Sequence, residues 1–257
     1  MFRFSSDPVK RLQQLRTIAR HPADARRLRR WVTAGVPIHP WPFGMPCSAA
    51  PHVVILGVSP GSSPRPEYKD FCTEGQSSTP PTIGAPHGGF FYPVPYWDKA
   101  RDLCVSLVRR DAPGLNEHEA VALSAHLNLG TGQYGVASER AIDDQIIQWV
   151  PQLLGARFPA KLLVCFGLNG LLGNAKYNDL WKRAGGLRLD WQRPDDTESF
   201  ERYTFRLWHA KRQDGSTMAV LMWPNHPSRH PFGGGPDSGM WQKAKRRAGA
   251  LLKRHGY

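Results

Sequence analysis

Three apolar runs constrain the fold of this chain more than any other feature of its sequence. The runs lie at 52–58, 161–166 and 218–223. Strands that are buried on both faces, as in a parallel sheet, read as continuous apolar runs and not as alternating ones. A fourth strand is expected at 123–129, and amphipathic helices are expected at 96–110, 138–154 and 238–255. This alternation predicts a three-layer α/β/α sandwich with a central four-stranded, mainly parallel sheet.

The chain divides into a basic N-terminal part and a longer remainder. Residues 1–50 hold an arginine-rich segment and a proline-rich stretch, which predict a helical extension followed by a linker. Residues 51–257 are numerous enough to form one sizeable α/β domain. Within it, the Gln-Asp-Gly sequence at 213–215 predicts a hairpin turn between 203–208 and 218–223.

The net charge narrows the class of partners. A surplus of lysine and arginine gives the chain a formal charge of +13 at pH 7. A surplus of this size favours a polyanion, most often nucleic acid, because the counterions that a polyanion releases drive such binding. A soluble basic protein without such a partner is the alternative.

Membrane and metal signals are weak in this sequence. No apolar run reaches the roughly 18 residues that span a bilayer, and the first residues do not read as a secretory segment, so we expect a cytoplasmic protein without a membrane partner. The four cysteines form no C-x-x-C pair, which argues against a zinc site or an iron–sulfur cluster. We expect a monomer that works without a metal or another cofactor.

Polar loops follow the carboxyl ends of all four predicted strands. They are Ser59-Pro60-Gly61, Asn128 with Gln133 beyond it, Gly167-Leu168-Asn169-Gly170 and Asn225-His226-Pro227-Ser228. Open α/β sheets bind ligands outside the carboxyl ends of their strands. Prolines before and after His226 restrict the last loop, although a proline-rich surface turn would read in the same way. The sequence therefore predicts a ligand site at this edge of the sheet.

In this order, the segments resemble the motifs of the uracil-DNA glycosylase superfamily. Residues 57–61 are similar to its G-x-x-P-G motif, and 224–228 are similar to its HPS motif. Phe90 or Phe91, followed by Tyr96 and Trp97, resembles the aromatic piece that the family has before its next helix. The segment at 162–170 resembles the strand–Gly–helix piece that precedes the family's last motif. The resemblance covers about residues 52 to 250. It implies an enzyme that flips a base out of DNA and hydrolyses its N-glycosidic bond without a metal.

The resemblance also implies a role for each motif residue. His226 would stabilise the base oxygen on which negative charge develops, with Ser59 and Asn225 as the other catalytic candidates. Asn128 would read the pyrimidine edge, because an amide offers a donor and an acceptor side by side. The other base-binding candidates are Phe90, Phe91, Gly57 and Val58. The DNA-binding candidates are Pro60, Gly61, Ser62, Pro227, Ser228, Arg229 and His230.

The first motif departs from the family's pattern. Val58 and Ser59 stand where the family places the acidic residue or asparagine that positions the attacking water, and serine is a poor general base. Glu67, Asp70 or Glu74 are possible substitutes. This departure leaves a catalytically inactive DNA-binding module as the alternative function. Uracil and a bulky modified cytosine, such as the glucosylated hydroxymethylcytosine of phage DNA, both remain open as the excised base, and the long loops at 65–89 and 233–239 would leave room for the larger one.

Overall fold

A computed structural model provides the structure of the chain. It describes residues 52–58, 95–129, 144–155, 160–227, 231–232 and 234–257. The predicted N-terminal extension at 1–50 and the loops at 59–94 and 130–143 lie outside the described residues. The four predicted parallel strands, by contrast, all lie within them.

The sheet contains six strands in the order β2-β1-β3-β6-β5-β4. Their bounds are β1 Val53–Gly57, β2 Ser124–Asn128, β3 Leu162–Phe166, β4 Asp196–Phe200, β5 Tyr203–Lys211 and β6 Thr217–Trp223. Strands β2, β1, β3 and β6 are parallel, whereas β5 pairs antiparallel with β6 and β4 pairs antiparallel with β5. The α/β class is confirmed, but the prediction of a four-stranded sheet was wrong.

The two extra strands have a physical explanation. The predicted hairpin at 213–215 is confirmed as the β5–β6 connection, and its first arm adds a fifth strand to the parallel set. Strand β4 alternates half-buried and exposed residues up to Phe200, because it lies at the edge of the sheet. Its sequence, Asp-Thr-Glu-Ser-Phe, lacks the apolar run that marks a central strand.

Three of the six described helices lie where helices were expected, at 96–110, 138–154 and 238–255. Their bounds are α5 Pro95–Asp111, α6 Glu117–Ala122, α7 Asp144–Gly155, α8 Asn169–Leu172, α9 Ala175–Ala184 and α10 Gly239–Arg254. Helix α10 begins after Ser238, whose side chain accepts a hydrogen bond from the backbone N–H of Trp241. The short helix α6 was not predicted, and it depends on a capping box between Asn116 and Glu119.

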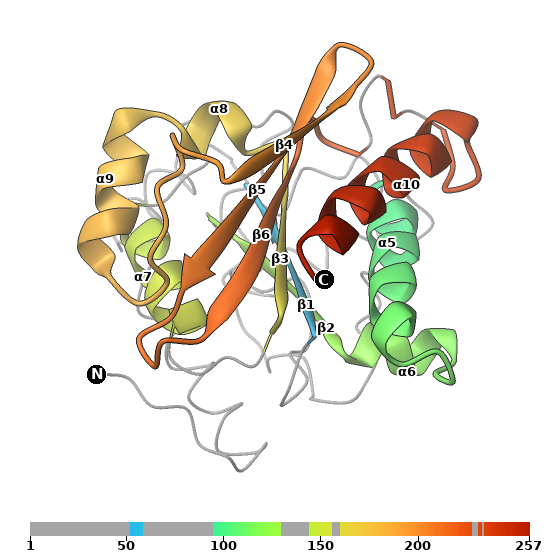
Figure 1. Cartoon of the computed structure of the whole chain (residues 1–257), viewed down its shortest axis with the longest axis horizontal. Coiled ribbons are helices and arrows are strands. Elements are labelled where there is room, and N and C mark those ends of the chain that lie inside the picture. Colours follow the sequence, from blue (N-terminus) through green and yellow to red (C-terminus); the bar gives the residue numbers. More distant parts are fainter. Residues whose placement is uncertain (1–51, 59–94, 130–143, 156–159, 228–230, 233) are drawn as a thin grey trace, which may run out of the picture.

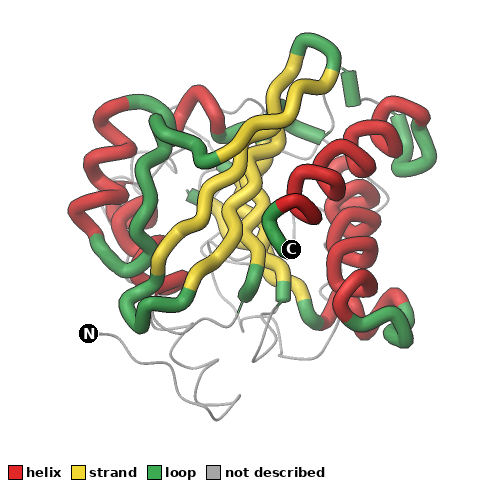
Figure 2. Tube along the Cα trace, in the orientation of Figure 1, coloured by secondary structure: helices red, strands yellow, loops and turns green. Residues whose placement is uncertain are grey.

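Helices cover both faces of the sheet, as Figure 1 shows, with α7, α8 and α9 on one face and α5 and α10 on the other. Figure 2 shows the strands as a twisted central layer between these helices. Alternate residues of β1 divide between the two faces. Val54 and Leu56 pack into the core beneath α7 and α9, and Val53 and Ile55 pack into the core beneath α5 and α10. Each helix layer thus has its own apolar core.

Strand β2 interrupts the second core with polar side chains. Ser124, His126 and Asn128 recur at every second position and are therefore on the same face of the strand. All three are buried. Their partners across the ladder are Val53, Ile55 and Gly57. The last pair, at the carboxyl ends of β1 and β2, belongs to the predicted site.

Candidate functional site

The parallel register brings the predicted site residues to one edge of the sheet. Gly57 is paired with Asn128, and Phe166 is paired with Trp223, which is the last residue of β6. The loops that follow β3 and β6 also touch, because a Cβ atom added to Gly167 would lie 3.3 Å from the backbone nitrogen of His226. Residues from all four parallel strands therefore meet at this edge.

Asn128 has a buried hydrogen-bond acceptor at this edge that the described residues leave unsatisfied. Its side chain is 2% exposed, and its Oδ1 atom accepts no hydrogen bond from the described residues. A Cβ atom on Gly57 would lie only 2.8 Å from that oxygen, so the carboxamide occupies the space that glycine leaves. An unsatisfied buried acceptor costs about 1–3 kcal/mol and is uncommon in folded proteins. Such a group is suited to a ligand that donates a hydrogen bond.

His226 is held by backbone and aromatic contacts. Its backbone N–H donates to Oδ1 of Asn225 at 2.8 Å, which fixes the turn between the two residues. Gly167 has a φ of +66°, a conformation in which glycine avoids the strain of a side chain, and it lies against the backbone of His226. The ring of Tyr96 stacks on the imidazole with a centroid distance of 4.9 Å and an interplanar angle of 16°. The imidazole plane is therefore defined by its neighbour.

Tyr96 links His226 to strand β2. Its hydroxyl oxygen lies 2.7 Å from Nε2 of His126, a hydrogen bond in which the donor depends on the histidine tautomer. Burial raises the pKa of the Tyr96 hydroxyl, so the phenol is neutral at pH 7. A Cβ atom on Gly57 would lie 3.4 Å from the same Nε2 atom. The site is thus contiguous from Asn128 to His226.

Sequence reasoning did not assign Tyr96 or His126 to the site. His126 carried a signal that could have been used, because it precedes Asn128 by two residues and must share its face of the strand. Tyr96 was noted only as an aromatic residue at the start of a helix. Tyr96 contacts His126, which is 30 positions away in the chain, and His226, which is 130 positions away. No local sequence pattern predicts contacts of that range.

Lys99, on the next turn of α5, also contacts this region. Its side chain is buried, and its Nζ donates to the backbone carbonyl of Pro227 at 2.8 Å and to that of Phe232. Burial lowers the pKa of Lys99, while the charge of Asp98 opposes that shift. Sequence reasoning gave no role to this lysine.

Several predicted residues lie outside the described part of the chain. They are Ser59, Pro60, Gly61, Ser62, Phe90, Phe91, Ser228, Arg229 and His230, together with the alternative acids Glu67, Asp70 and Glu74. Val58 is described, and its side chain packs in the core beneath α7 and α9. A base contact by Val58 would therefore use its backbone. Pro227 is buried, and its carbonyl accepts the hydrogen bond from Lys99.

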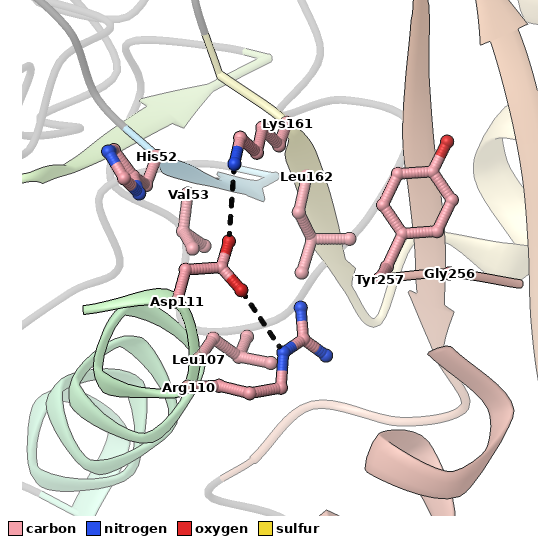
Figure 3. A pocket seen from close by; sticks show the side chains of 9 residues that line it. All are labelled: His52, Val53, Leu107, Arg110, Asp111, Lys161, Leu162, Gly256 and Tyr257. Atoms are coloured by element: carbon pink, nitrogen blue, oxygen red, sulfur yellow. Dashed lines mark ion pairs between the residues drawn. The ribbon is translucent and has the colours of Figure 1, made fainter. Parts of the chain in front are cut away.

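A separate cavity of about 120 Å³ opens at the opposite edge of the sheet, where β1 and β3 begin (Figure 3). It is lined by His52, Val53, Leu107, Arg110, Asp111, Lys161, Leu162, Gly256 and Tyr257. Asp111 lies between the two cations, 3.5 Å from Nε of Arg110 and 3.6 Å from Nζ of Lys161. The carboxylate of Asp111 therefore partners both cations of this cavity.

The described residues offer little for metal or thiol chemistry. They contain no group of three or more histidine, cysteine, aspartate or glutamate side chains that could hold a metal ion. Cys104 and Cys165 are buried free thiols. Burial raises the pKa of Cys104 to about 12, against the hydrogen bond with Ser124, and burial raises the pKa of Cys165 as well. Both groups are therefore protonated, unreactive thiols at neutral pH.

None of the described helices is both long and apolar enough to cross a membrane. No protein-family model matches this chain, and the comparison with curated proteins gave no match.

Proposed function

We propose that this protein is a monofunctional DNA glycosylase that excises an aberrant or modified pyrimidine. The observation that carries the proposal is the placement of Asn128 and His226 at the same carboxyl edge of the sheet. One has a buried amide acceptor without a partner among the described residues, the other an imidazole of fixed orientation, and Tyr96 and His126 lie between them. Recognition of a flipped base requires hydrogen-bonding groups such as this amide, and stabilisation of the leaving base requires a fixed donor such as the imidazole.

Asn128 supports recognition of a flipped pyrimidine. Its Oδ1 can accept a hydrogen bond from the ring N–H of uracil or from the exocyclic amino group of a cytosine, and its amide nitrogen can donate to the adjacent carbonyl oxygen of uracil or ring nitrogen of cytosine. Flipping the base costs a few kcal/mol, which the edge contacts and stacking must offset. Satisfying the buried oxygen of Asn128 contributes to that offset, because the free protein leaves it without a partner among the described residues.

His226 supports cleavage of the glycosidic bond. As the bond between the sugar C1′ and the base nitrogen breaks, its electron pair moves into the base and negative charge develops on a carbonyl oxygen of the base. A donor fixed near that oxygen stabilises the transition state more than the ground state. Water then adds hydroxide to C1′, its proton goes to the departing base or to solvent, and an abasic site remains. No lysine occupies a motif position, so a Schiff-base lyase reaction is not expected.

DNA as the partner is supported by charge. The net charge of +13 favours a polyanion, and phosphate contacts supply affinity that does not depend on sequence. Binding should therefore weaken steeply as salt rises, whichever base is excised. The cytoplasm, where DNA would be available to such an enzyme in a bacterial cell, remains the proposed location, and a monomer the proposed state.

The identity of the base is tested directly by excision. Purified protein is incubated with duplex and single-stranded DNA that carries uracil, hydroxymethylcytosine or glucosylated hydroxymethylcytosine, and alkali then cleaves the abasic sites. We expect strand breaks at one of these bases for the wild-type protein, formed about 100-fold more slowly by His226→Ala. Equal rates in the two proteins would exclude His226 as the group that stabilises the leaving base.

A second candidate function is a DNA-binding module without catalysis. The observation that favours it is Ser59 in the position of the residue that normally positions water. Tight, salt-dependent DNA binding with no strand breaks on any of the three bases would favour this module over the glycosylase.

A further inference from the structure

The ammonium group of Lys99 is fully buried, with an exposed fraction of 0%. Burial of a charge is costly unless hydrogen bonds compensate for the lost water. Lys99 follows Tyr96 by three residues on α5, so both side chains project from the same face of the helix. The helix turn that stacks on His226 therefore also carries this buried cation.

Both backbone acceptors of Lys99 follow His226 in the chain. The first is the carbonyl of Pro227, the next residue, at 2.8 Å, and the second is the carbonyl of Phe232. The ring of Trp241 lies 5.6 Å from the ammonium, on α10. One cation thus ties together α5, α10 and the peptide that leaves the candidate site.

The choice of acceptors distinguishes Lys99 from the other lysine between these two helices. Lys245 of α10 bonds to the carboxylate of Asp102 at 2.7 Å, an ordinary ion pair. Lys99 bonds to neutral carbonyls, and the described residues place no carboxylate in hydrogen-bond contact with its Nζ. A buried ammonium that donates to two carbonyls does not neutralise an opposite charge. It does fix the position of the backbone to which these carbonyls belong. A charge-assisted hydrogen bond of this kind is stronger than a neutral one.

We propose that Lys99 is a positioning residue for His226. Tyr96 sets the plane of the imidazole, and Lys99 holds the following peptide so that the ring cannot move away from the edge. The inference depends on the proposed function, since His226 is the group that would stabilise the departing base. Lys99 itself touches neither the substrate nor the reacting atoms.

Lys99→Met tests this role, because methionine fills a similar volume but donates no hydrogen bond. Lys245→Met is the matched control. We expect the single-turnover excision rate of Lys99→Met to fall by about 10- to 100-fold, the effect of misplacing a reacting group, with DNA affinity changed less than about threefold. The control should leave both values unchanged. If only the fraction of active protein falls, and the rate per active molecule is that of the wild type, Lys99 is a purely structural residue and the proposal is overturned.

A second readout does not require activity. In protein with isotope-labelled histidine, the ring signals of His226 should shift in Lys99→Met and stay in place in Lys245→Met. Unchanged His226 signals would overturn the proposal even if excision is impaired. If the wild-type protein excises no base at all, the proposed function fails, and this measurement still decides whether Lys99 positions His226.

The wild-type protein provides a test that no folding defect can obscure. The ammonium of Lys99 should exchange its protons slowly and should show nuclear couplings through its hydrogen bonds to the carbonyl carbons of Pro227 and Phe232. A rapidly exchanging Lys99 ammonium would refute the arrangement from which the proposal follows.

Discussion

Gly57→Ala tests the base-reading role of Asn128 with a single methyl group. The added Cβ would lie 2.8 Å from Oδ1 of Asn128, whereas ordinary van der Waals contact begins at 3.4 Å. The carboxamide must therefore withdraw by about 0.6 Å, which exceeds the tolerance of about 0.5 Å within which a binding group stays productive. We expect kcat/KM for base excision to fall by about 10- to 100-fold, equivalent to about 1.4–2.7 kcal/mol of transition-state stabilisation.

The stability of this variant should change little. Gly57 is absent from the residues with positive φ, so its backbone accepts alanine without strain. The lower conformational entropy of the unfolded chain favours alanine by about 0.4–1 kcal/mol, which offsets part of the cost of moving the carboxamide. Thermal unfolding and single-turnover excision on the same preparation separate the two effects. A loss of activity with an unchanged melting temperature is the expected combination.

Gly170→Ala is the matched control, because its added Cβ meets nothing within 4 Å. It should keep full excision activity. The reasoning would be refuted if Gly57→Ala were as active as the wild type, since a displaced Asn128 would then be irrelevant to the base. It would also be refuted if both variants lost activity equally, because the effect would then not depend on the contact with Asn128.

Three further predictions concern His226 and two polar groups outside the site. His226→Ala should reduce excision by about 100-fold or more, roughly 3 kcal/mol, with DNA affinity nearly unchanged in a binding titration; full activity in this variant would exclude it as the leaving-group stabiliser. Arg212→Met should lower the free energy of unfolding by about 3 kcal/mol in denaturant titrations. The reason is that the buried guanidinium donates hydrogen bonds to backbone carbonyls at the end of α7 and before β3. A loss below about 1 kcal/mol would contradict this. A hydrogen bond from Lys182 lowers the pKa of Asp190 to about 2 from 3.8, so its contribution to stability is present above pH 3.8 and is lost as the pH falls towards 2. In Asp190→Asn, the free energy of unfolding should therefore fall less steeply as the pH drops below 3.8. An unchanged pH dependence would show that Asp190 does not contribute to it.

The sequence predicted the parallel core well because its strands are buried on both faces. Apolar runs are long enough there to be recognised without tertiary information. Strand β4 was missed because it lies at the sheet edge and carries Asp196, Thr197 and Glu198. Helix α6 was missed because six residues produce too little periodicity to recognise.

Part of the candidate site was predictable because it follows the strands that were predicted. Asn128 and His226 follow predicted strands, and the carboxyl ends of parallel strands must share an edge. Tyr96, His126 and Lys99 were not assigned because their roles come from contacts across the fold. The hydrogen bonds of Lys99, for example, span 128 and 133 positions in the chain. Only the packing of α5 against the sheet brings such groups together.

The parallel connections also determine the electric field at the candidate site. Helices α5, α7 and α10 follow the parallel strands β1, β2 and β6 in the chain, so their N-termini lie towards the carboxyl edge of the sheet. Each N-terminus carries a partial charge of about +0.5 from its aligned peptide dipoles. Their combined potential would attract the phosphates of the proposed DNA substrate and favour the electron pair that a departing base retains. Part of the proposed attraction for DNA should therefore persist when every lysine and arginine near the site is neutralised, since its source is the backbone.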